Sequence, residues 1–79
     1  MTDDEAGLEA RLYVFLRERG YAVAGDGSIP EAAAEACLGL SRGTLRKRFE
    51  LGTLRVPYRV ESNRRWYRVC DLTRVLLGR

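Results

Sequence analysis

The sequence predicts a small α+β domain of three helices, a two-stranded β-hairpin and a short C-terminal helix. Three observations support this fold class. Apolar residues recur at helical spacing over residues 1–52, they alternate with polar residues between positions 55 and 70, and glycine-containing turns separate the segments. The chain has 79 residues, which fits one domain, 1–79, with a small core.

A first helix is expected over residues 1–20. Thr2 and Glu5 have the spacing of a capping box, in which each side chain accepts a hydrogen bond from the other residue's backbone N–H. Tyr13 and Val14 lie off the apolar stripe, so they should be exposed, with contact to a partner chain as the alternative. The apolar residues at helical spacing should form the buried face: Leu8, Leu12, Phe15 and Leu16.

Residues 28–52 are expected to form two helices joined by a tight turn, the helix-turn-helix arrangement. Ser28 and Glu31 repeat the capping-box spacing at the start of a short alanine-rich helix, which should end at Gly39. Ser41 is expected to cap the second helix. That helix has two apolar residues one turn apart that should anchor it to the core: Leu45 and Phe49.

A hairpin is expected over residues 55–70, with its tip at residues 62–65. Val56, Tyr58 and Val60 alternate with polar neighbours, as in a half-buried strand, and the proline between the first two suits an edge strand. A hairpin that follows a helix-turn-helix is a wing. The predicted fold is therefore a small winged helix-turn-helix.

A short terminal helix is expected over residues 71–78. Asp71 should cap its start, and Gly78 should end it. Its inward-facing residues should be Leu72, Val75 and Leu76.

Charge divides the chain into an acidic and a basic half. Residues 1–40 hold three arginines against eight acids, a balance of −5, whereas residues 41–79 hold eleven cations against three acids, a balance of +8. Thirteen of the fourteen cations are arginine, whose planar guanidinium matches phosphate oxygens and guanine edges in a bidentate way. The second half therefore suits a polyanionic partner.

The second helix of the pair and the hairpin carry the residues expected to contact DNA. A recognition helix enters the major groove, and a wing can reach the backbone or the minor groove. The expected contacts come from the turn, the helix and the hairpin: Ser41, Arg42, Gly43, Thr44, Arg46, Lys47, Arg48, Arg59, Arg64, Arg65 and Arg68.

Composition argues against several other classes of protein. The chain has no histidine, no glycine-rich phosphate loop and no paired carboxylates at a productive spacing, so we expect neither an enzyme nor a zinc site nor a cofactor. Cys37 and Cys70 lie among apolar residues and should act as small core side chains. No apolar stretch approaches the roughly 18 residues of a membrane span, and the start of the chain is too acidic for a secretory signal. A cytoplasmic, nucleoid-associated location is therefore expected.

Residues 28–77 resemble the winged helix-turn-helix of the MerR superfamily and its excisionase-like relatives. The resemblance rests on "EAAAEACLGLSRGTLRKR", on Gly52 and Leu54 after the second helix, and on "RRWYRVCDL". Glu35 departs from the family pattern, which has a small residue there, so Ala34 or Ala36 should take the packing role. A second departure is Arg48, where the family often places an aromatic residue that Phe49 can replace.

The resemblance implies sequence-specific binding of double-stranded DNA, by a small transcriptional regulator or by an excisionase that directs recombination. The expected partners are duplex DNA, further copies of the chain on that DNA, and in the second case a recombinase. The effector domain of typical MerR regulators has no counterpart in this sequence, so no small-molecule effector is expected. The alternative from another class is a winged-helix interaction module whose arginine surface docks on an acidic protein.

Overall fold

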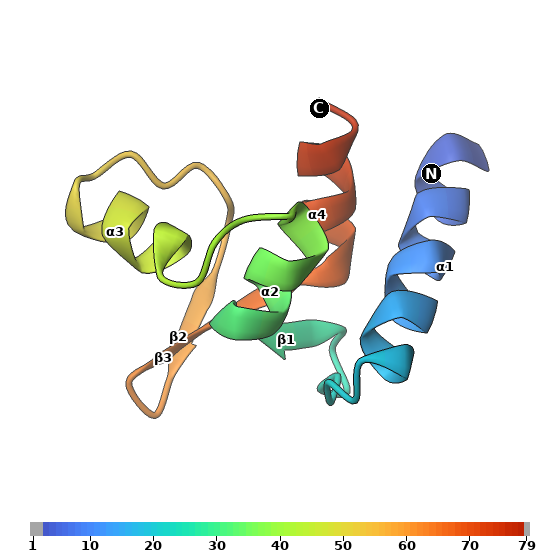
Figure 1. Cartoon of the computed structure of the whole chain (residues 1–79), viewed down its shortest axis with the longest axis horizontal. Coiled ribbons are helices and arrows are strands. Elements are labelled where there is room, and N and C mark those ends of the chain that lie inside the picture. Colours follow the sequence, from blue (N-terminus) through green and yellow to red (C-terminus); the bar gives the residue numbers. More distant parts are fainter. Residues whose placement is uncertain (1–2, 79) are drawn as a thin grey trace.

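A computed structural model describes residues 3–78 as an α+β arrangement of four helices and one three-stranded antiparallel sheet. In Figure 1, α1, α2 and α4 gather on one side, while α3 and the β2–β3 hairpin extend from the other. In chain order the elements are α1 (Asp3–Glu18), β1 (Ser28–Pro30), α2 (Glu31–Leu38), α3 (Thr44–Glu50), β2 (Arg59–Glu61), β3 (Arg64–Arg68) and α4 (Val69–Leu76).

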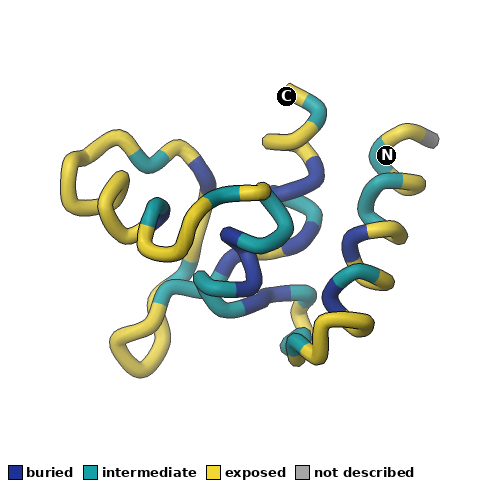
Figure 2. Tube along the Cα trace, in the orientation of Figure 1, coloured by how far each residue is buried: buried dark blue, intermediate teal, exposed yellow. Residues whose placement is uncertain are grey.

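Every described element except β2 contributes to one core. Figure 2 shows the buried segments in the helices and strands at the centre, whereas α3 and the hairpin tip are largely exposed. Ala33 and Ala34 are fully buried, because their small side chains let α2 lie close to the elements beside it. The remaining core residues are Leu12, Leu16, Ile29, Leu45, Val56, Tyr67, Val69 and Leu72.

The apolar stripe predicted for α1 is confirmed. Leu12 and Leu16 are buried, and the two other stripe residues pack against the core. Tyr13 and Val14 are 38% and 42% exposed, as expected from their place off the stripe. The capping box predicted for Thr2 and Glu5 includes a residue outside the described part of the chain.

Three capping predictions were wrong. Ser28 belongs to β1, and α2 starts after Pro30 without a side-chain cap. Ser41 lies too far upstream to cap α3, because Gly43 occupies the N-cap position with φ 88°, a left-handed conformation that favours glycine. Asp71 lies inside α4, which begins at Val69 directly after β3.

The third strand, β1, was not expected. The strand order is β1-β3-β2, and β1 pairs with β3 so that Ile29 lies opposite Tyr67. Both of these residues are fully buried, so the pairing carries part of the core. The Ser28–Pro30 strand is too short to show alternation in the sequence.

The hairpin turn is shorter than predicted. Ser62 and Asn63 alone form the turn, with φ values of 52° and 62°, and this left-handed pair joins β2 directly to β3. Arg64 and Arg65 are therefore strand residues. β2 is the edge strand, and consequently Val60 is 64% exposed rather than half buried.

The buried face of α4 is narrower than predicted. Leu72 is fully buried, whereas Val75 and Leu76 are 39% and 42% exposed. The helix has only eight residues, and its buried residues all lie in the first five positions: Val69, Leu72 and Thr73.

Leu45 joins α3 to the core through its buried side chain and one buried hydrogen bond. Leu45 enters the core, and its N–H donates to the Glu35 carboxylate over 3.0 Å. Glu35 is only 4% exposed, and its backbone carbonyl also accepts the N–H of Leu40 at 2.9 Å. Gly39 makes that turn possible with φ 70°. Glu35 thus satisfies an N–H at the start of α3 that has no partner within the helix, while the buried Ala34 fills the expected packing role.

Removing this carboxylate should destabilise the fold. We expect Glu35→Ala to lower the free energy of unfolding by about 1–3 kcal/mol, because the buried N–H of Leu45 loses its acceptor. Glu35→Gln keeps an acceptor oxygen and should lower the free energy of unfolding by less. Urea unfolding followed by circular dichroism measures both, with the exposed Glu50→Ala as a control expected within about 0.5 kcal/mol of wild type. Equal stabilities for Glu35→Ala and Glu50→Ala would contradict this role.

Candidate nucleic-acid interface

α3 carries three consecutive exposed cations. Arg46, Lys47 and Arg48 are all exposed, because Leu45 fixes which face of the helix points to the core. Arg42 and Gly43 are exposed in the turn before the helix. Two further predicted contacts lie here: Ser41, which is exposed, and Thr44, which is half buried.

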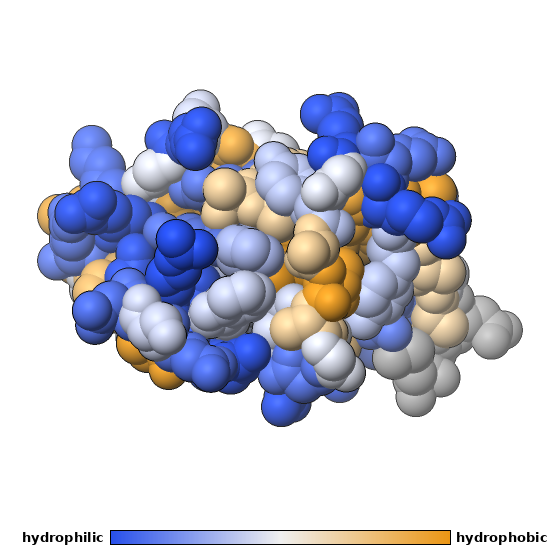
Figure 3. Space-filling view, turned by 90° about the horizontal axis from the view of Figure 1, so that it is seen from below, coloured by the Kyte–Doolittle hydropathy of each residue, from blue (hydrophilic) through white to orange (hydrophobic). Residues whose placement is uncertain are grey.

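A shallow hollow of about 380 Å³ lies between α3 and the hairpin. It brings Arg46 of α3 to the same place as Arg64 of β3, although these residues belong to different predicted elements. Asn63, from the turn, also lines it and was not predicted as a site residue. The other lining residues are Pro30, Glu31 and Arg65. In the view of Figure 3, hydrophilic residues cover much of the end of the molecule formed by the hairpin and α3.

Arg65 is engaged in contacts within the protein. Its Nε and Nη2 atoms donate to the two carboxylate oxygens of Glu31 over 2.6 and 3.0 Å. The Tyr67 hydroxyl donates to the same carboxylate over 2.6 Å. The guanidinium carbon also lies 4.4 Å from the centre of the Phe49 ring. Arg65 therefore links β3 to α2 and α3.

Phe49 anchors α3 to the hairpin rather than to the core. Its ring is 42% exposed and meets Tyr58 edge-on at a centroid distance of 5.8 Å. Tyr58 in turn lies 6.2 Å from Tyr67. Such ring pairs contribute about 0.5–1.5 kcal/mol beyond the area they bury. Together with Arg65, they fix the orientation of α3 relative to the hairpin.

Burial alone would raise the pKa of the Glu31 carboxyl. The hydrogen bonds from Arg65 and Tyr67, with the charges of Arg65 and Arg46, outweigh this desolvation, so the pKa of Glu31 lies below its ordinary value of 4.5. Glu31 is therefore ionised at neutral pH and neutralises the charge of Arg65.

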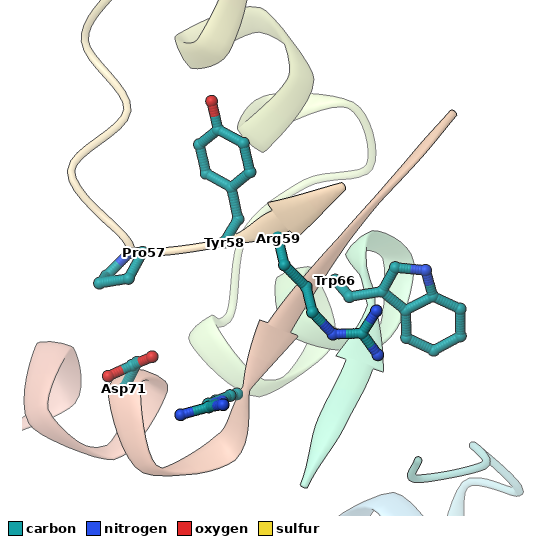
Figure 4. Close-up of a pocket in the computed structure, with 6 residues that line it drawn as sticks. Pro57, Tyr58, Arg59, Trp66 and Asp71 are labelled. Carbon is teal, nitrogen blue, oxygen red and sulfur yellow. The ribbon is translucent and has the colours of Figure 1, made fainter. Parts of the chain in front are cut away.

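Arg59, Trp66 and Arg68 lie on the other face of the sheet. Side chains alternate between the two faces along a strand, so Trp66 and Arg68 point away from the face that carries Arg65 and Tyr67. Arg59 lies opposite Trp66 in the β2–β3 register and therefore shares its face. Figure 4 shows Arg59 and Trp66 side by side, and the guanidinium carbon of Arg59 lies 5.4 Å from the ring centre of Trp66.

The two faces differ in charge. The segment 42–50 together with Arg64 holds five cations against one acid, Glu50, a balance of +4. On the other face, Arg59 forms ion pairs with Asp26, at 3.2 Å, and with Glu61. Arg64 alternates to this face of β3 as well and lines a second hollow with Arg59 and Trp66, although at the end of the strand it also lines the hollow beside α3. Apart from Arg64, three cations and three acids balance there: Arg59, Arg68, Arg74, Asp26, Glu61 and Asp71. The structure thus separates the predicted site residues into a basic surface beside α3 and a balanced face beside Trp66, with Arg64 at the end of the hairpin bordering both.

Among residues 3–78, no group of three or more histidine, cysteine or acidic side chains could hold a metal ion. None of the described helices is both long and apolar enough to cross a membrane. Cys37 and Cys70 are free thiols of intermediate burial, and desolvation raises the pKa of Cys37 to about 11.

Comparisons with protein-family models, with curated proteins and with solved structures gave no significant match.

Acid titration should reveal the Glu31 contacts. A carboxyl whose pKa is lowered in the folded state stabilises the fold above its unfolded pKa, and this contribution is lost as the pH falls through the folded value. Wild type should therefore lose stability below about pH 4.5, and Glu31→Gln should lose less over the same range. Urea unfolding at pH 7 and at steps down to pH 3 measures the difference, with Glu50→Gln as the control. If the free energies of unfolding of Glu31→Gln and wild type differ by the same amount at pH 7 and at pH 3, the assignment is contradicted.

Proposed function

We propose that this chain is a winged helix-turn-helix protein that binds double-stranded DNA in a sequence-specific manner. α3 enters the major groove, and the β2–β3 hairpin lies on the adjacent backbone or minor groove. The observation that carries the proposal is that Arg46 of α3 and Arg64 of the hairpin line one hollow, next to further exposed cations of α3.

The order of the elements supports the proposal. A helix and a short strand precede two helices joined by a glycine-containing turn, and a hairpin follows whose second strand pairs with the first strand of the chain. α3 is held only along one side, by Leu45 and the contacts of Phe49, so its opposite side is free to enter a groove. Two helices followed by a hairpin agree with the resemblance to the MerR superfamily, whereas β1 was not expected from it.

Charge supports the choice of ligand. The surface that includes α3 and Arg64 has a balance of +4, and each phosphate neutralised releases condensed counterions. Arg46 is engaged with Glu50 at 3.1 Å, but the two side chains are 73% and 60% exposed. Such an exposed pair is worth no more than about 1 kcal/mol, so phosphate or a base edge can replace Glu50.

The residues have different roles in this proposal. Arg42 stands before α3, where recognition helices present side chains to base edges, and Arg46 and Lys47 face the groove. Arg64 contacts the backbone from the hairpin. Arg65 is a positioning residue, since its guanidinium is already occupied by Glu31 and Phe49. We do not include Arg59 and Arg68 in the contact surface, because they lie on the balanced face.

Two biological roles fit this binding activity: a small transcriptional regulator and an excisionase. Footprinting on the DNA that flanks the gene separates them. Repeated sites beside an integrase attachment site support an excisionase, and a site over a promoter supports a regulator.

The double variant Arg46→Ala/Lys47→Ala should abolish the shift of duplex DNA in a native gel. Both cations face away from the core, so the fold should be unaffected, which thermal unfolding can verify. Arg17→Ala/Arg19→Ala removes the same charge from the end of α1 and the turn after it, and should leave most of the binding intact. Unchanged DNA affinity in the first variant rejects the proposal and favours an acidic protein as the partner of this surface.

Removing Arg64 should weaken binding to all sequences about equally. One lost phosphate contact should reduce the slope of log affinity against log salt by about 1. Arg68→Ala, on the balanced face, is the matched control and should leave the slope unchanged. If removing Arg64 and removing Arg68 reduce this slope equally, DNA does not bind the α3 side in preference to the balanced face.

A further inference from the structure

An apolar hollow lies on the exposed side of α1, at the far end of the molecule from α3 (Figure 1). Val14 lies at its centre and is 42% exposed. A cation and an acid flank it on the same helix, two turns apart: Arg11 and Glu18. The remaining lining residues are Ala10 and Phe15.

We propose that this surface binds the same surface of a second copy, with the two α1 helices antiparallel. A two-fold axis between Val14 and Phe15 brings Val14 of each copy against the apolar hollow of the other. Arg11 and Glu18 lie equally far from that axis, about 5 Å along the helix on either side. Each arginine of one copy therefore meets the glutamate of the other, and the pair forms twice.

The charges select both the partner and the direction. An interface with two-fold symmetry must be complementary to itself, and a cation and an acid placed symmetrically about an apolar centre satisfy that condition. A parallel pair would instead place Arg11 beside Arg11 and Glu18 beside Glu18, which is repulsive. Within the described residues, neither side chain is engaged in an ion pair that would have to break first.

Pairing through α1 leaves the basic surface free. α3 and α1 lie at opposite ends of the molecule in Figure 1, so a dimer would present two copies of α3 outward. One pair of short helices buries less than the roughly 1,200 Å² of a standard interface, so the dimer should be weak in solution. The inference does not depend on DNA binding.

Sedimentation velocity over a concentration series tests this pairing. Wild type should show a concentration-dependent monomer–dimer equilibrium. Arg11→Glu and Glu18→Arg should each weaken it at least about tenfold, because each creates two like-charge contacts. The double variant Arg11→Glu/Glu18→Arg exchanges the charges and should restore the dimer. Arg17→Glu is the matched control on the same helix, outside the hollow, and should leave the equilibrium unchanged.

Two results would overturn the inference. One is a wild type that remains monomeric up to about 1 mM, where even a dimer with a binding free energy of about −4 kcal/mol would be half formed. The other is a double variant that dimerises no more strongly than the single variants. The substituted side chains are exposed, and circular dichroism can verify that each variant folds. A loss of pairing with an unchanged shift of DNA by the monomer would contradict this inference while leaving the proposed function in place.

Discussion

The position of α3 relative to the hairpin depends on one carboxylate, that of Glu31. It stands in the first turn of α2, where the helix dipole favours a negative charge, and it accepts hydrogen bonds from Arg65 and Tyr67. The other side of the Arg65 guanidinium lies against Phe49 of α3. A single ion pair thus connects α2, β3 and α3, and it lines the same hollow as Arg46 and Arg64.

The charge asymmetry between the two halves of the chain is smaller on the surface than in the sequence. The acidic half of the chain does not stay apart from the basic half, because Glu31 pairs with Arg65 and Asp26 pairs with Arg59. Those two arginines stabilise the fold, and the cations left for a ligand are fewer than the sequence suggests. They are concentrated on α3, its preceding turn and Arg64. The smaller basic surface is better defined than a uniformly positive half, since the contacts of Phe49 with Tyr58 and Arg65 hold its helix against the hairpin.

Local patterns predicted the parts of the fold that depend on local spacing. The stripe of α1, the glycine turn and the exposed basic helix follow from periodicity, and Leu45 was found by its place in that pattern. The errors involve contacts between distant residues. Glu31 and Arg65 are 34 positions apart, and no local signal marks them as partners. Glu35 was treated as a packing departure, although its carboxylate bonds the N–H of Leu45. Ser28 has the sequence spacing of a helix cap, and the three-residue strand to which it belongs is too short to be recognised from the sequence.

Backbone amide NMR during titration with a DNA duplex tests the central claim most directly, because non-specific phosphate contacts use the same basic surface as specific ones. The account predicts that chemical shifts change at residues 42–48 and 62–64, while those of Arg59, Trp66 and Arg68 change little. Shifts centred on the Trp66 face, or none at saturating duplex in low salt, would contradict it.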